Sequence, residues 1–226
     1  MRNLIISAVI PVREGSRRVK EKNIRPFAGT TLLENKLSQL KRVSLIDNII
    51  ISSDSEKMLE IGLNNNVIAR KRPREFCDEQ SKTFNQVVEY IASQELEADI
   101  LVWVPCVCPL IDETYIEMAI EEFIGCRQDG FDSVVSSTLI KEYLFNEQNE
   151  PINFSIEHHV PSQLLPAWHI IINGFFIAKP SDMVRWKFVY GKKPKLIEVE
   201  PSKSIDIDDE TDFFVAEQLM KMHICH

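Results

Sequence analysis

The chain has 226 residues, of which 44% are hydrophobic and 27% charged, which is enough apolar material for one sizeable globular domain. Its formal net charge of −8 argues against a broad nucleic-acid-binding face, and the lack of any apolar run of about 18 residues predicts no membrane span. Its five cysteines contain no C-x-x-C pair, which predicts buried thiols in a reducing cytoplasm rather than disulfides or a zinc site.

A cationic segment follows the first predicted strand. The apolar run Leu4–Ile10 ends at Pro11, and residues 13–25 then hold six Lys or Arg side chains against two Glu, a local charge of +4. Such a segment is commonly a solvated loop. In an otherwise acidic chain, however, it is also where a polyanionic ligand would bind, and we keep both interpretations open.

Apolar strands and amphipathic helices alternate along the rest of the chain. Apolar runs predict strands over 47–53, 67–69, 99–104, 132–136 and 195–199. Apolar residues at helical spacing predict helices that begin near residues 31, 54, 83, 112, 180 and 212. This order predicts an α/β fold with three α/β/α layers around a mostly parallel central sheet. Ligands bind such sheets at the carboxyl ends of the strands, where the cationic segment lies.

The alternation breaks after Thr138. Residues 139–168 form a mixed segment dotted with Pro and Asn, which we interpret as an insertion in a single domain spanning 1–226. The next extended run, His169–Ala178, contains Asn173-Gly174 at its middle. This pair is typical of a two-residue hairpin turn. It is also typical of a place where the backbone closely approaches a ligand, because glycine has no side chain.

Two aspartates near the C-terminus are candidate metal ligands. Asp206 and Asp208 flank Ile207, and in an extended segment such carboxylates share one face about 6.5–7 Å apart. A pair of this kind suits Mg²⁺, which also binds substrate phosphates. The alternative is that these acids simply favour the N-terminus of the closing helix, where the helix dipole stabilises negative charge.

The cationic segment contains the groups that a triphosphate requires. Arg13, Ser16 and Lys22 supply charge and hydrogen bonds, and backbone N–H groups around Gly15 would add an anion-binding nest. The chain has neither a G-x-x-x-x-G-K-[ST] nor a G-x-G-x-x-G motif, so neither a Walker loop nor a dinucleotide cofactor is predicted.

Several longer motifs recur in order along almost the whole chain. IPVREGSRRVKEKNI opens it, and ISSDSEKMLEIG, RPREFCDEQSKTFNQVVEYI, CPLIDETYIEMAIEEF, INGFFIAK and SIDIDDETDFFVAEQ follow. Together they resemble the CMP-sialic acid synthetases (acylneuraminate cytidylyltransferases), whose opening signature is approximately I-P-A-R-G-G-S-K-x-I-x-x-K-N-I. The opening run and the closing D-I-D carry most of the resemblance. The fold it implies is that of the nucleotide-diphospho-sugar transferases.

The resemblance implies cytidylyl transfer from CTP to a nonulosonic (sialic-type) acid sugar, with Mg²⁺ as cofactor and a CMP-sugar and pyrophosphate as products. It also implies a homodimer, in which the segment 139–168 reaches the second subunit. The implied roles are catalysis for Arg13, Lys22 and Asp208, CTP binding for Gly15, Ser16, Asn23, Arg72 and Thr83, sugar binding for Gln163 and Asn173, and Mg²⁺ binding for Asp206 and Asp208.

Three departures from the family pattern keep other functions open. Glu14 stands where the loop commonly has its first glycine, Lys20 replaces a frequent proline, and Pro105 replaces an amide side chain that contacts the nucleotide. The alternatives are a cytidylyltransferase for another acid sugar, such as 3-deoxy-manno-octulosonate, and a catalytically weakened nucleotide-binding relative. A glycosyltransferase is less favoured, because its acidic pair would follow a strand in the middle of the chain.

Overall fold

A seven-stranded sheet forms the centre of the molecule. The computed structural model describes residues 4–16, 18–78 and 80–224, so Arg17 of the cationic segment lies outside the described residues. The strands of the sheet are β1 (Ile6–Pro11), β4 (Asn48–Ser53), β5 (Ile68–Lys71), β6 (Ile100–Trp103), β7 (Ser133–Ile140), β8 (Trp168–Ala178) and β9 (Pro194–Glu198). Their order is β5-β4-β1-β6-β8-β7-β9. Only the pairings of β8 are antiparallel among these strands, which confirms the predicted mostly parallel sheet.

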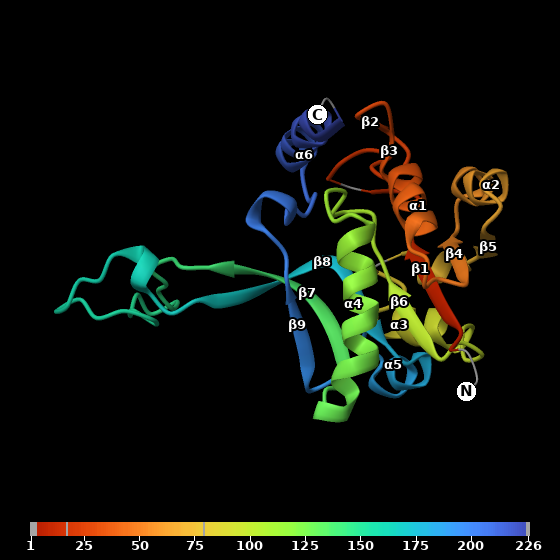
Figure 1. Cartoon of the computed structure of the whole chain (residues 1–226). Coiled ribbons are helices and arrows are strands. Elements are labelled where there is room, and N and C mark those ends of the chain that lie inside the picture. The colour runs from red at the N-terminus through yellow and green to blue at the C-terminus, as the bar shows by residue number, and fades with distance from the viewer. Residues whose placement is uncertain (1–3, 17, 79, 225–226) are drawn as a thin grey trace.

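Helices cover both faces of this sheet (Figure 1). They are α1 (Leu32–Arg42), α2 (Glu56–Asn64), α3 (Phe84–Ser93), α4 (Glu113–Cys126), α5 (Pro180–Trp186) and α6 (Glu210–Ile224), with the 3₁₀ turns η1 (Arg74–Phe76), η2 (Arg127–Asp129), η3 (Ser162–Leu164) and η4 (Pro201–Lys203) and a small hairpin of β2 (Pro26–Phe27) and β3 (Thr30–Thr31). Apolar side chains of α1, α2 and α4 share a core with one face of the sheet, and those of α3 and α5 share a second core with the other. The three predicted layers are therefore present. None of the helices within the described residues is long and apolar enough to cross a membrane.

The two cores follow from the alternation of side chains along each strand. Ala8 and Ile10 of β1 belong to the core under α1 and α4, whereas Val9 belongs to the core under α3 and α5. The helices start at local capping signals: Thr31 caps α1, and Thr83 forms a capping box at the start of α3. The four described cysteines are buried and free, as the sequence predicts.

The hairpin-turn interpretation of Asn173-Gly174 is wrong. Both residues lie inside the continuous strand β8. The pairing of β8 with β7 shifts register between Val135 and Ser137, so β8 bulges at this point and a turn is not formed. A bulge re-aims a side chain relative to the regular strand pattern. Here it leaves Asn173 facing a cavity at the edge of the sheet.

Ser136 of β7 compensates the backbone groups that the bulge removes from the ladder. Its Oγ lies 3.2 Å from the Gly174 N–H and 3.0 Å from the Phe175 N–H, both of which donate to it. Glycine fits at 174 without displacing a neighbour, whereas a Cβ there would lie 2.2 Å from Cδ1 of Ile111. The close backbone approach that the sequence indicates is thus to a core side chain of the protein itself.

An arm, defined here as residues 141–167, projects from the body between β7 and β8 (Figure 1). It has little regular structure apart from η3 and an isolated bridge between Phe145 and Pro151. The rings of Tyr143 and Phe145 pack edge-to-face against Phe154 and give the arm a small aromatic centre. Several large apolar side chains in or next to the arm remain exposed: Phe145, Ile152, Ile156, Leu164, Trp168, Ile170 and Ile171.

The bulge predicts a large effect of a small substitution. We expect Gly174→Ala to lower the free energy of unfolding by roughly 1–3 kcal/mol, because the added methyl group overlaps Ile111 in a packed core. Gly125→Ala is the matched control, since nothing lies within 4 Å of a Cβ at that position near the end of α4. It should be neutral or stabilise by up to about 1 kcal/mol. Urea unfolding curves measure both changes, and equal midpoints for the two variants would contradict the packing described here.

Candidate functional site

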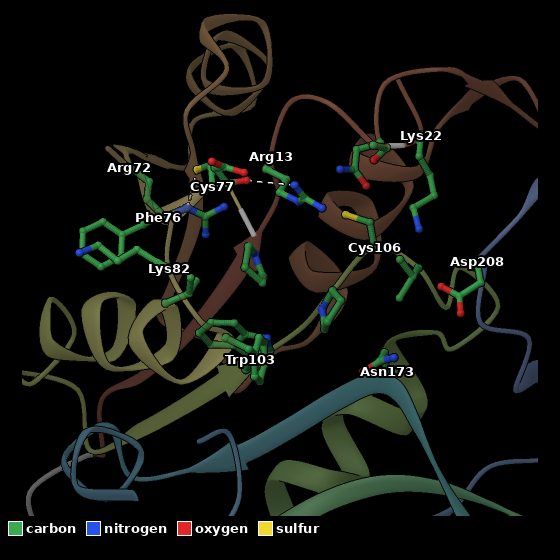
Figure 2. A pocket seen from close by; sticks show the side chains of 18 of the residues that line it. Arg13, Lys22, Arg72, Phe76, Cys77, Lys82, Trp103, Cys106, Asn173 and Asp208 are labelled. Atoms are coloured by element: carbon green, nitrogen blue, oxygen red, sulfur yellow. Dashed lines mark hydrogen bonds between the residues drawn. The ribbon is translucent and has the colours of Figure 1, made fainter. Parts of the chain in front are cut away.

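A cavity of about 480 Å³ opens at the carboxyl ends of β1, β5 and β6, next to the segment that precedes α6 (Figure 2). This is the edge of the sheet at which ligands are expected in such folds. The residues predicted from the sequence that line it are Arg13, Ser16, Lys22, Asn23, Arg72, Thr83, Asn173, Asp206 and Asp208. Gly15 instead lines a neighbouring cavity of about 610 Å³, and Gln163 lies exposed on the arm.

The cationic segment and the C-terminal aspartates meet directly across this cavity. Lys22 Nζ donates to the backbone carbonyl of Ile207 over 2.6 Å. The Arg18 guanidinium forms an ion pair with Asp208, at 2.7 Å between Nη2 and Oδ1. These contacts join positions more than 180 residues apart in the chain. The sequence did not indicate Arg18, because its place in the opening motif carries no fixed residue in the family signature.

Burial and mutual repulsion shape the charge on this acidic side. Desolvation raises the pKa of Asp206, and the nearby Asp208 carboxylate raises it further, while a hydrogen bond from Asn173 lowers it. That bond runs 2.6 Å from Asn173 Nδ2 to Asp206 Oδ2. Burial lowers the pKa of Lys22, against the opposing effect of the two aspartates. Lys22 and Asp206 are thus partly buried with only neutral hydrogen-bond partners within the described ranges, which is typical of residues at a binding site for a charged ligand.

Asp206 and Asp208 are the residues of the cavity that could hold a divalent cation. The repulsion between their carboxylates would be relieved by a cation between them. Among the described residues, no group of three or more His, Cys, Asp or Glu side chains is arranged to hold a metal alone. A cation at Asp206 and Asp208 would therefore need ligands from water and from substrate phosphates, which is the usual arrangement for Mg²⁺.

One hydrogen-bond donor of Arg72, a residue of the cavity lining, has no acceptor among the described residues. The residue is only 4% exposed, and its Nη2 donates to the carbonyl of Val12 over 2.7 Å. Its Nη1 is buried without a partner in the described part of the chain. A buried donor without an acceptor costs about 1–3 kcal/mol, so an acceptor on a bound ligand would recover this energy.

The other end of the cavity is aromatic. Phe84 at the start of α3 packs edge-to-face on Trp103 at the end of β6, with ring centroids 6.2 Å apart. Phe76 and Val87 complete this wall, and Lys82 Nζ lies 5.2 Å from the centre of the Phe76 ring. Sequence reasoning missed these residues, because an aromatic side chain in a helix or strand is more commonly core. The available signal was that Phe84 follows the predicted site residue Thr83.

Two of the departures from the family pattern have a defined place in the structure. Glu14 lies outside the lining of the main cavity and lines the neighbouring one, where its backbone N–H donates to Asp54 Oδ1 over 3.0 Å. Glu14 is therefore part of the neighbouring cavity and not of the main one. Pro105 does line the main cavity, so that wall lacks the amide that the family uses.

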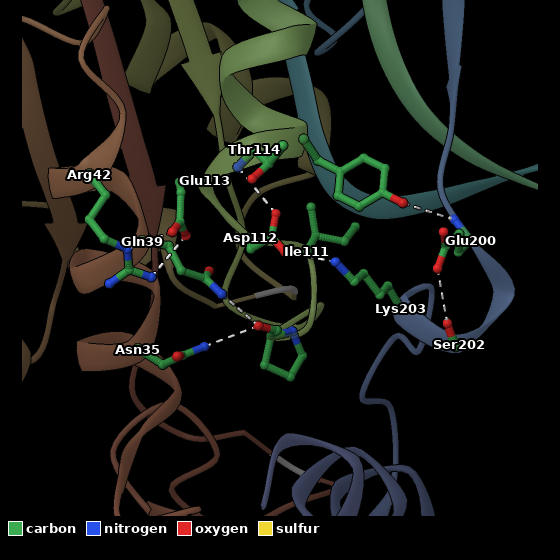
Figure 3. A network of polar contacts seen from close by, with 12 residues as sticks. Asn35, Gln39, Arg42, Ile111, Asp112, Glu113, Thr114, Glu200, Ser202 and Lys203 are labelled. Carbon is green, nitrogen blue, oxygen red and sulfur yellow. Dashed lines mark hydrogen bonds and ion pairs between the residues drawn. The ribbon is translucent and has the colours of Figure 1, made fainter. Parts of the chain in front are cut away.

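Side chains of α1 hold the loop 105–111 that forms the floor of the cavity. Asn35 and Gln39 donate to the Pro109 carbonyl over 3.1 and 2.8 Å (Figure 3), and Lys36 donates to the Cys108 and Ile111 carbonyls over 3.3 and 2.8 Å. Lys36 is fully buried, and desolvation lowers its pKa to about 8. Burial raises the pKa of Cys106 to about 12, so this cavity-lining thiol stays protonated at neutral pH.

The fold and this cavity define a nucleotidyltransferase-like α/β protein. Residues 7–158 match a protein family described as cytidylyltransferase. The chain therefore belongs to the cytidylyltransferase family, and the resemblance inferred from the sequence motifs is confirmed at this level.

Individual relatives have low sequence identity to this chain but align over most of its length. The chain is 26% identical to the N-acylneuraminate cytidylyltransferase A of Danio rerio over 94% of its own length, but spans only 50% of that relative. It is 25% identical to the pseudaminic acid cytidylyltransferase of Campylobacter jejuni subsp. jejuni serotype O:23/36 (strain 81-176), over 99% of this chain and 98% of that one. Among solved structures, CMP:2-keto-3-deoxy-manno-octonic acid synthetase complexed with CTP is similar in fold, with a TM-score of 0.69, 14% identity and coverage of 97% and 99%.

The buried lysine predicts a pH-dependent stability. Below its folded pKa of about 8, the folded chain must carry a buried ammonium group, which lowers the free energy of unfolding. As pH rises from 8 towards 10.5, the folded lysine loses its proton before the unfolded one, so the cost disappears. We therefore expect the free energy of unfolding of the wild type, relative to that of Lys36→Met, to rise by roughly 2–3 kcal/mol between pH 7 and pH 10.

Urea midpoints of both proteins at the two pH values measure this double difference. Lys41→Met is the control, because it removes an exposed lysine from the same helix and leaves the buried Lys36 in place. A wild-type advantage that is the same at both pH values would show that Lys36 is not buried as described.

Proposed function

We propose that the chain transfers the cytidylyl group of CTP to a nonulosonic (sialic-type) acid sugar, with a CMP-sugar and pyrophosphate as products and Mg²⁺ as cofactor. The observation that carries this proposal is the meeting of the cationic segment with Asp206 and Asp208 in one cavity at the end of a parallel sheet. Family membership supports the cytidylyl transfer, and the relatives named for N-acylneuraminate and pseudaminic acid support the sugar class.

In the proposed reaction, the anomeric hydroxyl of the sugar attacks the α-phosphorus of CTP. A new P–O bond forms, the bond to the bridging oxygen breaks, the hydroxyl proton is released, and pyrophosphate leaves. No protein nucleophile is required, so the chain contributes position and charge. Arg13 and Lys22 would hold the β- and γ-phosphates. Asp206 and Asp208 would hold Mg²⁺, which when bound neutralises phosphate charge.

The remaining cavity residues divide between nucleotide and sugar in this proposal. Ser16 and Asn23 lie in the wall formed by the cationic segment, with Gly15 shaping its turn. The unpartnered Nη1 of Arg72, beside Thr83, would donate to an acceptor on the nucleotide. Asn173 faces the cavity from the bulge in β8 and would line the sugar side.

We also propose a homodimer formed through the arm. The arm carries exposed apolar side chains on a segment that projects from the body, which is costly in an isolated chain. Gln163 lies on the arm and outside the cavity of its own chain. A role for Gln163 at the sugar would therefore require the arm to reach the cavity of a second copy.

A specific observation also supports 3-deoxy-manno-octulosonate as the alternative substrate. The chain is 31% identical to the 3-deoxy-manno-octulosonate cytidylyltransferase of Trichlorobacter lovleyi (strain ATCC BAA-1151 / DSM 17278 / SZ), over 53% of its own length and 45% of that protein. The same assay therefore has to include this sugar acid together with the nonulosonic acids. The acid that supports the highest kcat/KM identifies the substrate class.

Pyrophosphate release from CTP with Mg²⁺ and a panel of acid sugars tests the reaction. We expect Asp208→Asn to lower kcat by on the order of 100-fold or more, because a cation ligand is lost. Its thermal stability should stay close to that of the wild type, because the Asp208 side chain is 57% exposed and its ion pair with Arg18 lies at the surface.

The control for this variant is Asp209→Asn, which changes the adjacent carboxylate but keeps an oxygen to cap the Thr211 and Asp212 N–H groups. It should retain wild-type turnover. Wild-type kcat in Asp208→Asn would remove the cation assignment. Retained CTP binding without pyrophosphate release for any acid would favour the catalytically weakened relative.

The arm predicts a change of oligomeric state on a single substitution. Leu164 is 72% exposed at the 3₁₀ turn of the arm, and we expect Leu164→Glu to convert a dimer to a monomer, because it places a charge in an apolar interface. Leu63→Glu is the control, since Leu63 is 63% exposed on α2, away from the arm. Light scattering after size-exclusion chromatography gives both masses, and a monomeric wild type would refute the proposed dimer.

A further inference from the structure

Cys77 stands between the two arginines that reach the cavity from different strand ends. Its backbone carbonyl accepts a hydrogen bond from Arg13 Nη1 over 3.0 Å. Its Sγ accepts one from Arg72 Nε over 2.9 Å. Figure 2 shows Cys77 beside Arg13 and Arg72 at the rim of the cavity. One residue thus contacts two of the cations that the proposed function assigns to the nucleotide.

The contacts of Arg72 fix the orientation of its guanidinium group. Nε is held by Cys77 and Nη2 by the carbonyl of Val12, on opposite sides of the planar guanidinium group. Because the group is planar and rigid, two fixed donors also fix the third nitrogen, Nη1. This nitrogen is the one without a partner in the described residues, and Arg72 lines the cavity.

The thiol of Cys77 is suited to accept this hydrogen bond and to remain in place. Burial raises the pKa of the thiol, Arg72 lowers it, and the Asp54 carboxylate raises it. The raised pKa keeps the thiol protonated, and its sulfur accepts the hydrogen bond from Arg72 Nε. Asp54 in turn accepts the backbone N–H of Glu14 in the cationic segment. Cys77 itself directly follows η1, and its backbone N–H donates to the Arg74 carbonyl at the end of that turn.

We propose that Cys77 is a positioning residue for the nucleotide: its sulfur and carbonyl hold Arg72 and Arg13 so that Arg72 Nη1 presents one N–H donor to an acceptor oxygen of the bound nucleotide. The inference rests on the proposed function, because it takes the nucleotide as the ligand of the cavity. If the thiol only filled space, any other side chain of the same volume would serve equally well at this position. The proposal instead requires a hydrogen-bond acceptor at this position.

The affinity for CTP, measured by titration calorimetry, tests the requirement for an acceptor. We expect Cys77→Ala to raise Kd by about five- to tenfold, because Arg72 loses its orientation and not its charge. Cys77→Ser keeps a hydrogen-bond acceptor at this position, and its Kd should remain within about twofold of the wild-type value. Cys126→Ala is the matched control, since it removes a buried free thiol at the end of α4, outside the cavity lining.

Steady-state kinetics separate positioning from loss of structure. Cys77→Ala should raise the KM for CTP while leaving the KM for the sugar and kcat within about twofold. In a background of Arg72→Met, adding Cys77→Ala should change the Kd for CTP by less than about twofold, because the thiol acts through the arginine. Equal Kd values for wild type and Cys77→Ala, or additive effects of the two substitutions, would overturn the proposal.

A measurement without nucleotide distinguishes failure of this inference from failure of the proposed function. The Nε–H signal of Arg72 in a ¹H–¹⁵N spectrum should exchange slowly with solvent in the wild type and in Cys77→Ser, because the proton is buried and bonded. It should exchange at least tenfold faster in Cys77→Ala. An unchanged exchange rate would overturn the positioning role even if CTP binds. Slow exchange in a wild type that binds no CTP would uphold the Cys77–Arg72 contact but overturn the nucleotide as its ligand, and with it the proposed function.

Discussion

The contact between the cationic segment and the aspartates that precede α6 is the interaction on which the site depends. Each side concentrates like charge, with Arg13, Arg18 and Lys22 on one and Asp206 and Asp208 on the other. Without the other, the like charges within each group would repel one another and would favour exposure to solvent. Brought together, each partly satisfies the other, and the Arg18–Asp208 pair and the Lys22 bond to the Ile207 carbonyl join residues from opposite ends of the chain. A triphosphate with a divalent cation carries the same two kinds of charge and can exchange partners with them.

The cavity between these charges keeps its shape through buried polar contacts rather than through apolar packing alone. Asn35, Lys36 and Gln39 of α1 hold the floor loop by its carbonyls, and Ser136 holds the bulge from which Asn173 faces the cavity. Groups of this kind are costly to bury unless they are fully paired, so they tolerate few alternative arrangements. They therefore position the cavity walls before any ligand arrives, which lowers the cost of binding.

Much of the fold could be predicted because its determinants are local. Apolar runs end where strands end, capping residues such as Thr83 mark helix starts, and the spacing of Asp206 and Asp208 puts both at one cavity. Of the two interpretations of Asn173-Gly174, the hairpin turn was wrong, because the same dipeptide also suits a bulge and the partner strand decides between them. The aromatic wall of Phe84 and Trp103 was missed because local sequence does not distinguish a cavity wall from a core. The roles of Gln163 and of the arm stay predictions.

The amino-acid sequence by itself determined the order of strands and helices, the cationic segment at the end of the first strand and the aspartate pair near the C-terminus, because each depends on residues within a few positions of one another. Only the tertiary structure decided that Glu14 lies outside the lining of the main cavity, that Arg18 pairs with Asp208 and that Cys77 lies between Arg13 and Arg72. These contacts depend on strand register and on the paths of loops from several strand ends. Such features are set by packing across the whole sheet, and no local pattern in the chain records them.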